Sequence, residues 1–159
     1  MQKASPEYTL LVLSIASPLL LGVYRNGELL EKIESEKKTS EVLLAIVSEL
    51  LGRYALSGII YTRGPGSYMS IKLSYIILKT IEIVKGIPLA GCSAFSCNGG
   101  APIRAIGNLY FVKEGESIVT KRFNEPLPQL FSLPASLQGL SIDPLSIPDY
   151  TLPAVQPAG

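Results

Sequence analysis

Residues 59–72 read IIYTRGPGSYMSIK, and this stretch decides the fold. Apolar residues run into the turn Gly64-Pro65-Gly66, and a helix-like segment follows directly. A strand, a glycine turn and the start of a helix together form a place where backbone N–H groups can face an anion. The same tripeptide also simply ends strands, and Ser67 is an ordinary helix N-cap, so a ligand loop and a structural turn both stay open. The candidate loop residues are Gly64, Pro65, Gly66, Ser67 and Tyr68.

The length and composition fit a small protein with a partner. The 159 residues suffice for one domain with a hydrophobic core, or for one domain with a small appendage. Hydrophobic residues make up 47% and charged residues 17% of the chain, against a typical charged share of about 25%. The net charge of +1 gives no electrostatic footprint for nucleic acid.

The reactive residue types are few. Cys92 and Cys97 are the only cysteines, and their spacing fits neither a zinc knuckle nor a C-x-x-C redox pair, so we expect free thiols in a reducing compartment. The chain contains no histidine, which removes the commonest general base and the commonest metal ligand. We therefore expect no metal site and no Ser-His-Asp or Cys-His catalysis.

The apolar run 9–21 is the part of the chain closest to a signal peptide. It is too short to span a bilayer, and Pro18 interrupts it. Asn26-Gly27 follows as a hairpin turn signal. We interpret this region as three antiparallel strands that form a meander, in a protein that stays in the cytoplasm and away from the membrane.

Local signals predict the remaining elements. They indicate a helix at 41–54 capped by Ser40, a strand at 59–62, a helix at 67–85 that ends at Gly86, and a short strand at 87–90. Residues 92–100 fit a loop or a weak helix, and residues 108–123 fit a hairpin. Proline recurs from residue 126 to residue 157, so this tail forms neither a regular helix nor a central strand.

Both predicted helices carry more apolar surface than one core face needs. Apolar residues of the first helix cover about 160° of the helical wheel, against a stripe of roughly 100°. The second helix leaves only a narrow polar strip at Lys72, Lys79 and Glu82. Either the helices pack on their own sheet and on each other, or a second subunit covers them. The candidate partner-contact residues are Leu43, Val47, Leu50, Ile71, Lys72, Tyr75, Ile76 and Lys79.

This order of elements resembles the TsaB family, also called YeaZ, whose hallmark is a GPGSFTGxRxG segment at the same junction. Here residues 64–74 read GPGSYMSIKLS. Residues 86–93, GIPLAGCS, are similar to the family segment P-hydrophobic-x-G-V-S, and residues 105–110, AIGNLY, to its strand A-R-x-x-E-V-Y. The resemblance covers roughly residues 8–123, with weaker similarity at 148–150.

The resemblance implies an α/β protein with the actin-like, ribonuclease-H-like (ASKHA) fold. This fold has a mixed sheet with a three-stranded antiparallel meander and flanking helices. We expect a ribonuclease-H-like lobe at 1–100 and a reduced second lobe at 101–159, made of the hairpin 108–123 and the proline-rich tail 126–159. We hypothesise that the tail wraps over the surface as an extended segment, against a neighbouring subunit.

The resemblance also implies a function. Members of the family belong to the bacterial machinery that makes N6-threonylcarbamoyladenosine in tRNA, and they are not themselves the transferase. The chain is therefore expected to be a non-catalytic scaffold that forms a heterodimer with a TsaD-like catalytic subunit, joined by a TsaE-like ATPase in a larger complex. The helices that flank the glycine loop make most of the family's subunit contact. Contact with tRNA is expected to be indirect, and a homodimer in the absence of the partner stays open.

Several departures from the family pattern concern the nucleotide site. Ser14 stands where the family's first strand ends in an aspartate, the residue that holds metal and phosphate in related ATPases. Met69, Ser70, Lys72 and Ser74 replace the usual Thr, Gly, Arg and Gly, and Thr39 stands about where a histidine often precedes the first helix. We expect no cofactor, with ATP bound only at the level of a complex, if at all. The alternative is a stand-alone actin-like nucleotide-binding protein or ATPase that uses Gly64, Gly66 and Ser67 on phosphate.

Overall fold

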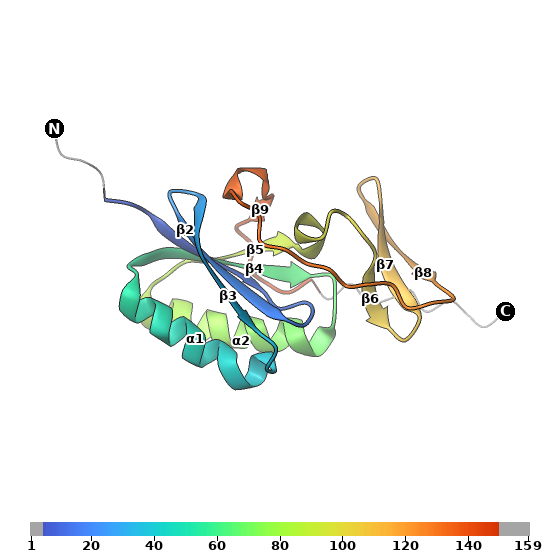
Figure 1. The fold of residues 1–159 in the computed structure, drawn as a ribbon, viewed down its shortest axis with the longest axis horizontal. Coiled ribbons are helices and arrows are strands. Elements are labelled where there is room, and N and C mark those ends of the chain that lie inside the picture. Colours follow the sequence, from blue (N-terminus) through green and yellow to red (C-terminus); the bar gives the residue numbers. More distant parts are fainter. Residues whose placement is uncertain (1–4, 150–159) are drawn as a thin grey trace.

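The computed structural model describes residues 5–149, and Figure 1 shows how their elements are arranged. The helices are α1 (Thr39–Arg53) and α2 (Tyr68–Lys85), with short 3-10 turns η1 (Ala94–Cys97) and η2 (Leu137–Gly139). The strands are β1 (Tyr8–Leu13), β2 (Leu19–Arg25), β3 (Glu28–Ser35), β4 (Leu56–Gly64), β5 (Leu89–Ser93), β6 (Ile103–Ile106), β7 (Leu109–Glu114), β8 (Ser117–Arg122) and β9 (Ile142–Asp143).

A six-stranded mixed sheet forms the centre of the protein, in the order β3-β2-β1-β4-β5-β9. Strands β1, β2 and β3 pair antiparallel, which confirms the predicted meander. Asn26 and Gly27 join β2 to β3 with φ values of 50° and 84°, the positive φ pair that a tight hairpin turn requires. Strand β4 runs parallel to both β1 and β5, so the sheet is mixed, as expected.

The two helices lie side by side on one face of this sheet (Figure 1). Their inward residues recur at helical spacing, at Leu43, Val47 and Leu50 in α1 and at Leu78 and Ile81 in α2. These side chains join apolar residues of the strands in one buried cluster. This core fixes the direction of both helices relative to the ends of β1 and β4.

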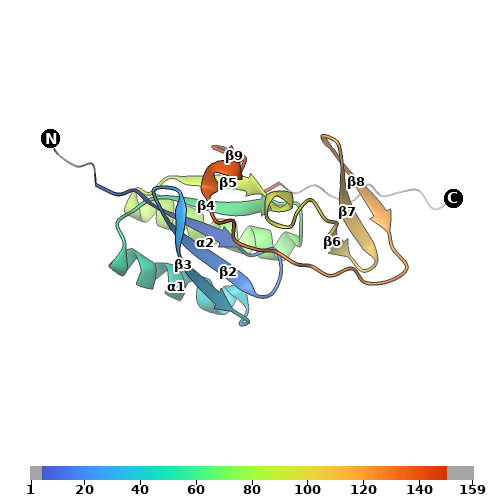
Figure 2. The same cartoon turned by 45° about the horizontal axis from the view of Figure 1, so that its top comes forward.

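An extended segment covers the opposite face of the main sheet. After β8 the chain runs back from the small sheet to the main sheet (Figure 2), and Phe131, Leu133 and Leu137 pack against the buried residues of this face. The Leu29 N–H donates to the Ala135 carbonyl at 2.9 Å. Within residues 5–149, this segment forms the strand β9, which lies at the sheet edge beside β5. This agrees with the prediction from the prolines that the tail forms no central strand. The predicted tail continues to residue 159, and residues 150–159 lie outside the described part of the chain.

Strands β6, β7 and β8 form a separate three-stranded antiparallel sheet. Strands β7 and β8 confirm the predicted hairpin. Residues 105–110, which resemble one strand of the family, instead contain a turn at Gly107, where φ is 57°, between β6 and β7. Phe111 and Ile103 pack with Phe95 of η1, so a small third core joins this sheet to the main one. The boundary expected between residues 100 and 101 stays a prediction.

Some predicted boundaries were wrong. Helix α1 starts at Thr39 with Lys38 as N-cap, so Ser40 is already helical and cannot cap it. The fifth strand spans Leu89–Ser93 rather than 87–90. Residues 91–93 have little strand preference of their own, but they pair in parallel with β4. Cys92 and Cys97 are free thiols, as predicted, and both are buried. No helix within residues 5–149 is long and apolar enough to cross a membrane.

Candidate functional site

The glycine turn between β4 and α2 packs against the chain's own residues. Gly64 has a φ of 137°, and a Cβ added there would lie 2.6 Å from the Asp149 carbonyl oxygen. A Cβ on Gly66 would lie 3.0 Å from Ile15 Cγ2. Glycine is therefore needed at position 64, because φ is positive and a backbone carbonyl lies against it, whereas a Cβ at position 66 would require the Ile15 side chain to shift.

The start of α2 lacks a side-chain cap. Ser67 occupies the N-cap position, as predicted, but its hydroxyl makes no capping hydrogen bond. The Ile71 N–H instead donates to the Ser67 carbonyl at 3.1 Å. Half-exposed Tyr68 follows, with the Lys72 Nζ atom 5.8 Å from the centre of its ring. The five candidate loop residues are thus contiguous at the end of β4, with Tyr68 turned partly to solvent.

Ser14 and Ser74 form a buried pair directly behind this turn. Their hydroxyl oxygens lie 2.6 Å apart, and both residues are buried. The pair joins the end of β1 to α2. It occupies the position at which the resemblance places an aspartate that would hold a metal ion.

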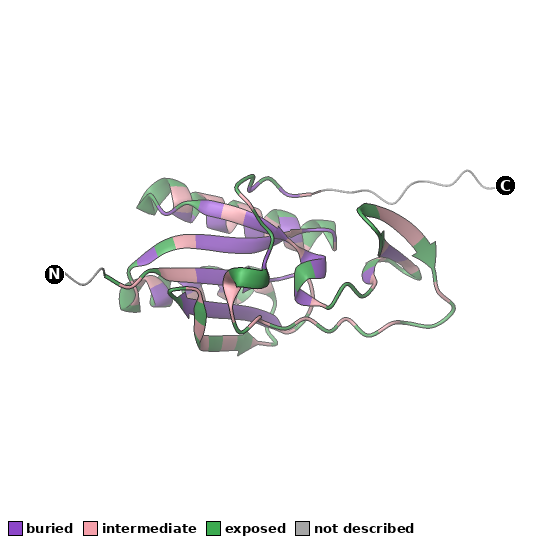
Figure 3. Cartoon of the chain, turned by 90° about the horizontal axis from the view of Figure 1, so that it is seen from above, coloured by how far each residue is buried: buried purple, intermediate pink, exposed green. Residues whose placement is uncertain are grey.

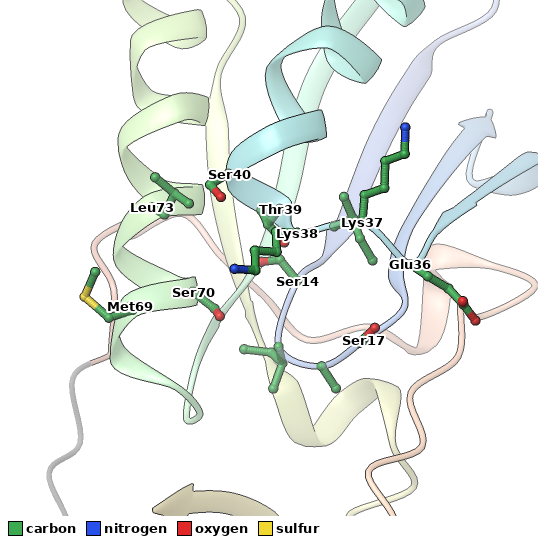
Figure 4. A pocket seen from close by; sticks show the side chains of 13 residues that line it. Ser14, Ser17, Glu36, Lys37, Lys38, Thr39, Ser40, Met69, Ser70 and Leu73 are labelled. Carbon is green, nitrogen blue, oxygen red and sulfur yellow. The ribbon is translucent and has the colours of Figure 1, made fainter.

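A pocket of about 660 Å³ opens where β1 ends and the two helices begin (Figure 4). Its lining includes the hydroxyl groups of Ser14, Ser17, Thr39, Ser40 and Ser70. The Lys38 side chain lies between the two helix starts, whereas the Glu36 carboxylate, the only one in this lining, points away. Lys37 also belongs to the lining, so hydroxyl groups and two lysines without a facing acid supply no pair for general acid-base chemistry.

A second pocket of about 470 Å³ lies between the main sheet and the small sheet. It shares residues 15–17 with the first pocket and adds Ser67, Arg104 and Gln129. The Arg104 Nε donates to the Gly107 carbonyl at 3.2 Å, and the Arg104 backbone N–H donates to Gln129 Oε1 at 2.9 Å. Within residues 5–149, no cluster of three acidic or cysteine side chains could hold a metal ion.

Four of the predicted partner-contact residues lie in the core. The buried ones occupy the helical positions that face the sheet. They are Leu43, Val47, Leu50 and Ile71. Tyr75 is half-buried, and its ring stacks on Tyr61 at a centroid distance of 6.3 Å. The prediction that these residues contact a partner was therefore wrong for Leu43, Val47, Leu50 and Ile71, which are buried.

The other predicted contact residues lie on the outer side of α2. Ile76 is half-exposed, Lys79 pairs with Glu82, and Lys72 lies beside Tyr68. The predicted contact residues leave out the most exposed apolar residues of the helices, which are Leu44, Met69, Ile83 and Val84. Helical phase could have found Met69 and Ile83, which stand opposite the inward positions of α2, whereas Leu44 and Val84 stand to the side of the inward positions.

Comparison with solved structures shows that the chain has a YeaZ-like fold. The chain is similar to an uncharacterized protein with similarity to peptidase YeaZ, from Pseudomonas aeruginosa, with 16% identity, a TM-score of 0.56, and coverage of 77% of this chain and 70% of that chain. It is also similar to YeaZ from Pseudomonas aeruginosa, with 16% identity, a TM-score of 0.54, and coverage of 87% of this chain and 68% of that chain.

These comparisons confirm the predicted fold class. The mixed sheet with its meander, the flanking helices and the separate small sheet are consistent with an ASKHA-like fold. No protein-family model and no curated protein sequence matches the chain. At 16% identity the likeness defines the fold alone.

Proposed function

We propose that this chain is a TsaB-like, non-catalytic scaffold that binds and supports a TsaD-like catalytic subunit in the N6-threonylcarbamoyladenosine modification of tRNA. The YeaZ-like fold supports a role of this kind. In the proposal the heterodimer works in the cytoplasm, a TsaE-like ATPase completes a larger complex, and tRNA contacts this chain only indirectly.

The observation that carries the proposal is an apolar stripe along the outer side of α2. Met69, Ile76 and Ile83 recur at seven-residue intervals and are 70%, 50% and 73% exposed. Residues spaced by seven lie on one side of a helix, so these three side chains form one line. Lys72 and Lys79 lie beside it. An aligned set of exposed apolar side chains is typical of a protein contact surface.

The chemistry of the pocket supports a non-catalytic role and the absence of a cofactor in the isolated chain. The sequence holds no histidine, and the Ser14–Ser74 pair occupies the expected position of the metal-binding acid. The turn residues Gly64 and Gly66 are closed by Asp149 and Ile15. A phosphate group at this turn would have to displace them.

A pull-down with a co-expressed TsaD-like subunit tests the proposal. We expect the wild-type chain to co-purify with that subunit and Ile76→Glu to lose at least about tenfold in affinity, because the charge would be desolvated at the contact. Leu30→Glu is the matched control, since Leu30 lies on β3 and is 50% exposed, as Ile76 is. A folded Ile76→Glu variant that bound as well as the control would refute the α2 contact.

Calorimetry with ATP and Mg²⁺ tests the nucleotide-binding alternative. We expect no heat of binding for the isolated chain, because Asp149 fills the space over Gly64. Tight binding by the isolated chain would favour the stand-alone nucleotide-binding protein over the scaffold.

A further inference from the structure

Residues 143–149, here called the strap, begin at the last residue of β9 and cross the ends of β5 and β4. In Figure 3 the strap is the last coloured stretch before the grey C-terminal trace, and it includes buried residues. The buried Tyr61 hydroxyl donates to the Ser146 carbonyl at 2.5 Å, and the Arg63 Nε donates to the Ile147 carbonyl at 2.7 Å. Two consecutive strap carbonyls are thus held by two side chains of β4.

The backbone of the sheet is shaped to receive the strap. A Cβ on Gly91 would lie 2.3 Å from Arg63 Cδ and 3.1 Å from the Leu145 carbonyl oxygen, so glycine there makes room first for the Arg63 side chain and then for the strap. At the far end, the Asp149 N–H donates to the Arg63 carbonyl at 2.7 Å. Gly64 gives Asp149 the same close approach on β4.

Recognition of the strap depends strongly on its backbone. The contacts from Tyr61, from Arg63 Nε and to the Arg63 carbonyl all use strap backbone atoms. The side chains of Leu145 and Ile147 are 50% and 53% exposed. One strap side chain adds an ion pair, since an Asp143 oxygen lies 3.6 Å from Arg63 NH1. A site that reads backbone carbonyls and N–H groups tolerates a range of peptide sequences.

The strap is also poorly anchored by apolar contacts. Ser146 and Pro148 are its buried residues, whereas its large apolar side chains face solvent. Segments with few buried apolar contacts open locally at a lower free energy than core strands do. We therefore expect the strap to open at a lower free energy than the core strands.

We propose that the groove formed by Tyr61, Arg63, Gly64 and Gly91 is a peptide-binding site that the chain's own strap occupies. When the strap opens, the groove accepts an extended peptide segment of a partner protein, held through the same backbone contacts. The site lies next to α2, because Tyr61 stacks on Tyr75. The inference does not rest on the proposed scaffold function, since it uses the contacts of the strap alone.

A labelled peptide with the sequence of residues 141–149, added to the full chain, tests this site by fluorescence anisotropy. Asp143→Ala removes the ion pair with Arg63 and the hydrogen bond that Asp143 accepts from the Leu145 N–H, but leaves the groove residues unchanged, so it should tighten peptide binding by about two- to fivefold. Adding Arg63→Ala to Asp143→Ala removes a groove donor and should weaken binding by about tenfold relative to Asp143→Ala. Arg25→Ala, at an exposed arginine at the end of β2, is the control and should bind like the wild type.

Tyr61→Phe added to Asp143→Ala gives a second groove variant that keeps the stacked ring. It should weaken peptide binding by about threefold, because it removes one hydrogen-bond donor. Circular dichroism confirms that each variant is folded. The proposal is overturned if Asp143→Ala binds no more tightly than the wild type, or if neither groove variant binds more weakly than Asp143→Ala alone.

Discussion

The hydroxyl oxygens of Ser14 and Ser74 lie 2.6 Å apart, so the end of β1 is tied to the middle of α2. Both serines are departures from the pattern of the family that the sequence resembles, which has an aspartate and a glycine at these positions. The two departures therefore meet in one buried hydrogen bond. Ser14 therefore lines the first pocket and also links β1 to α2 through this hydrogen bond.

Ser14→Asp should destabilise the fold rather than restore a metal site. Ser14 is 3% exposed, and a buried carboxylate without a cation costs about 3–5 kcal/mol in the free energy of unfolding near pH 7. Burial raises the pKa of such a group, so the loss should shrink as the pH falls and the carboxyl is neutralised. Urea unfolding at pH 7 and pH 5 measures this, with Ser14→Ala, expected to cost about 1–3 kcal/mol, for comparison. Wild-type stability of Ser14→Asp at pH 7 would contradict the prediction.

Adjacent leucines on α1 should differ sharply in their contribution to stability. Leu43 is fully buried, so Leu43→Ala should lower the free energy of unfolding by about 3 kcal/mol through lost burial and a cavity. Leu44 is 57% exposed, so Leu44→Ala should change it by less than about 0.5 kcal/mol. Denaturant unfolding compares the two. Equal losses would mean that α1 faces the sheet differently.

Two glycine-to-alanine substitutions should have opposite signs. Gly64→Ala should cost more than about 1 kcal/mol, because φ is 137° and the new Cβ would meet the Asp149 carbonyl. Gly52→Ala should stabilise the protein by about 0.5–1 kcal/mol, because Gly52 lies in α1 with nothing within 4 Å of an added Cβ. Thermal unfolding of both variants checks the signs. Stabilisation by Gly64→Ala would show that the turn is looser than the structure indicates.

Glu82 should make stability depend on pH in the acid range. Its carboxylate pairs with Lys79 and accepts the Leu89 N–H at 2.6 Å, and these two interactions lower its pKa. A lowered folded-state pKa gives stability that is present above the unfolded pKa of about 4.3 and is lost as the pH falls through the folded value. Glu82→Gln should therefore cost about 1 kcal/mol at pH 7 and almost nothing at pH 3.

Unfolding measured from pH 7 to pH 3 tests this dependence. Glu116→Gln, in the exposed turn between β7 and β8, is the control and should follow the wild-type curve. A constant difference between Glu82→Gln and the wild type at every pH would contradict the role of the charge.

Local sequence signals were enough to predict the secondary-structure elements that form from neighbouring residues. The Asn26-Gly27 turn and the apolar periods were sufficient for the meander and the two helices. Strand β5 was harder, because Gly91, Cys92 and Ser93 have little strand preference and pair only through β4. Helix faces could not be assigned from an apolar excess alone, so Val47 and Ile76 were predicted to share one surface although one is buried and the other exposed.

The closing of the glycine turn could not be predicted from the sequence. Asp149 reaches Gly64, and Ser146 reaches Tyr61, across more than eighty residues. No local pattern encodes such contacts, because they depend on where the extended segment returns to the sheet. The candidate loop was found from its residues, but its neighbours came only from the three-dimensional structure.

The extended segment that covers one face of the main sheet has a consequence for synthesis on the ribosome. Tyr24 and Cys92 are made early, and the residues that cover them, from Phe131 to Leu140, emerge much later. A nascent chain that has completed β5 therefore carries an apolar sheet face with nothing over it, the kind of surface that chaperones bind. Full protection of that face comes only after residues 131–140 have left the ribosome.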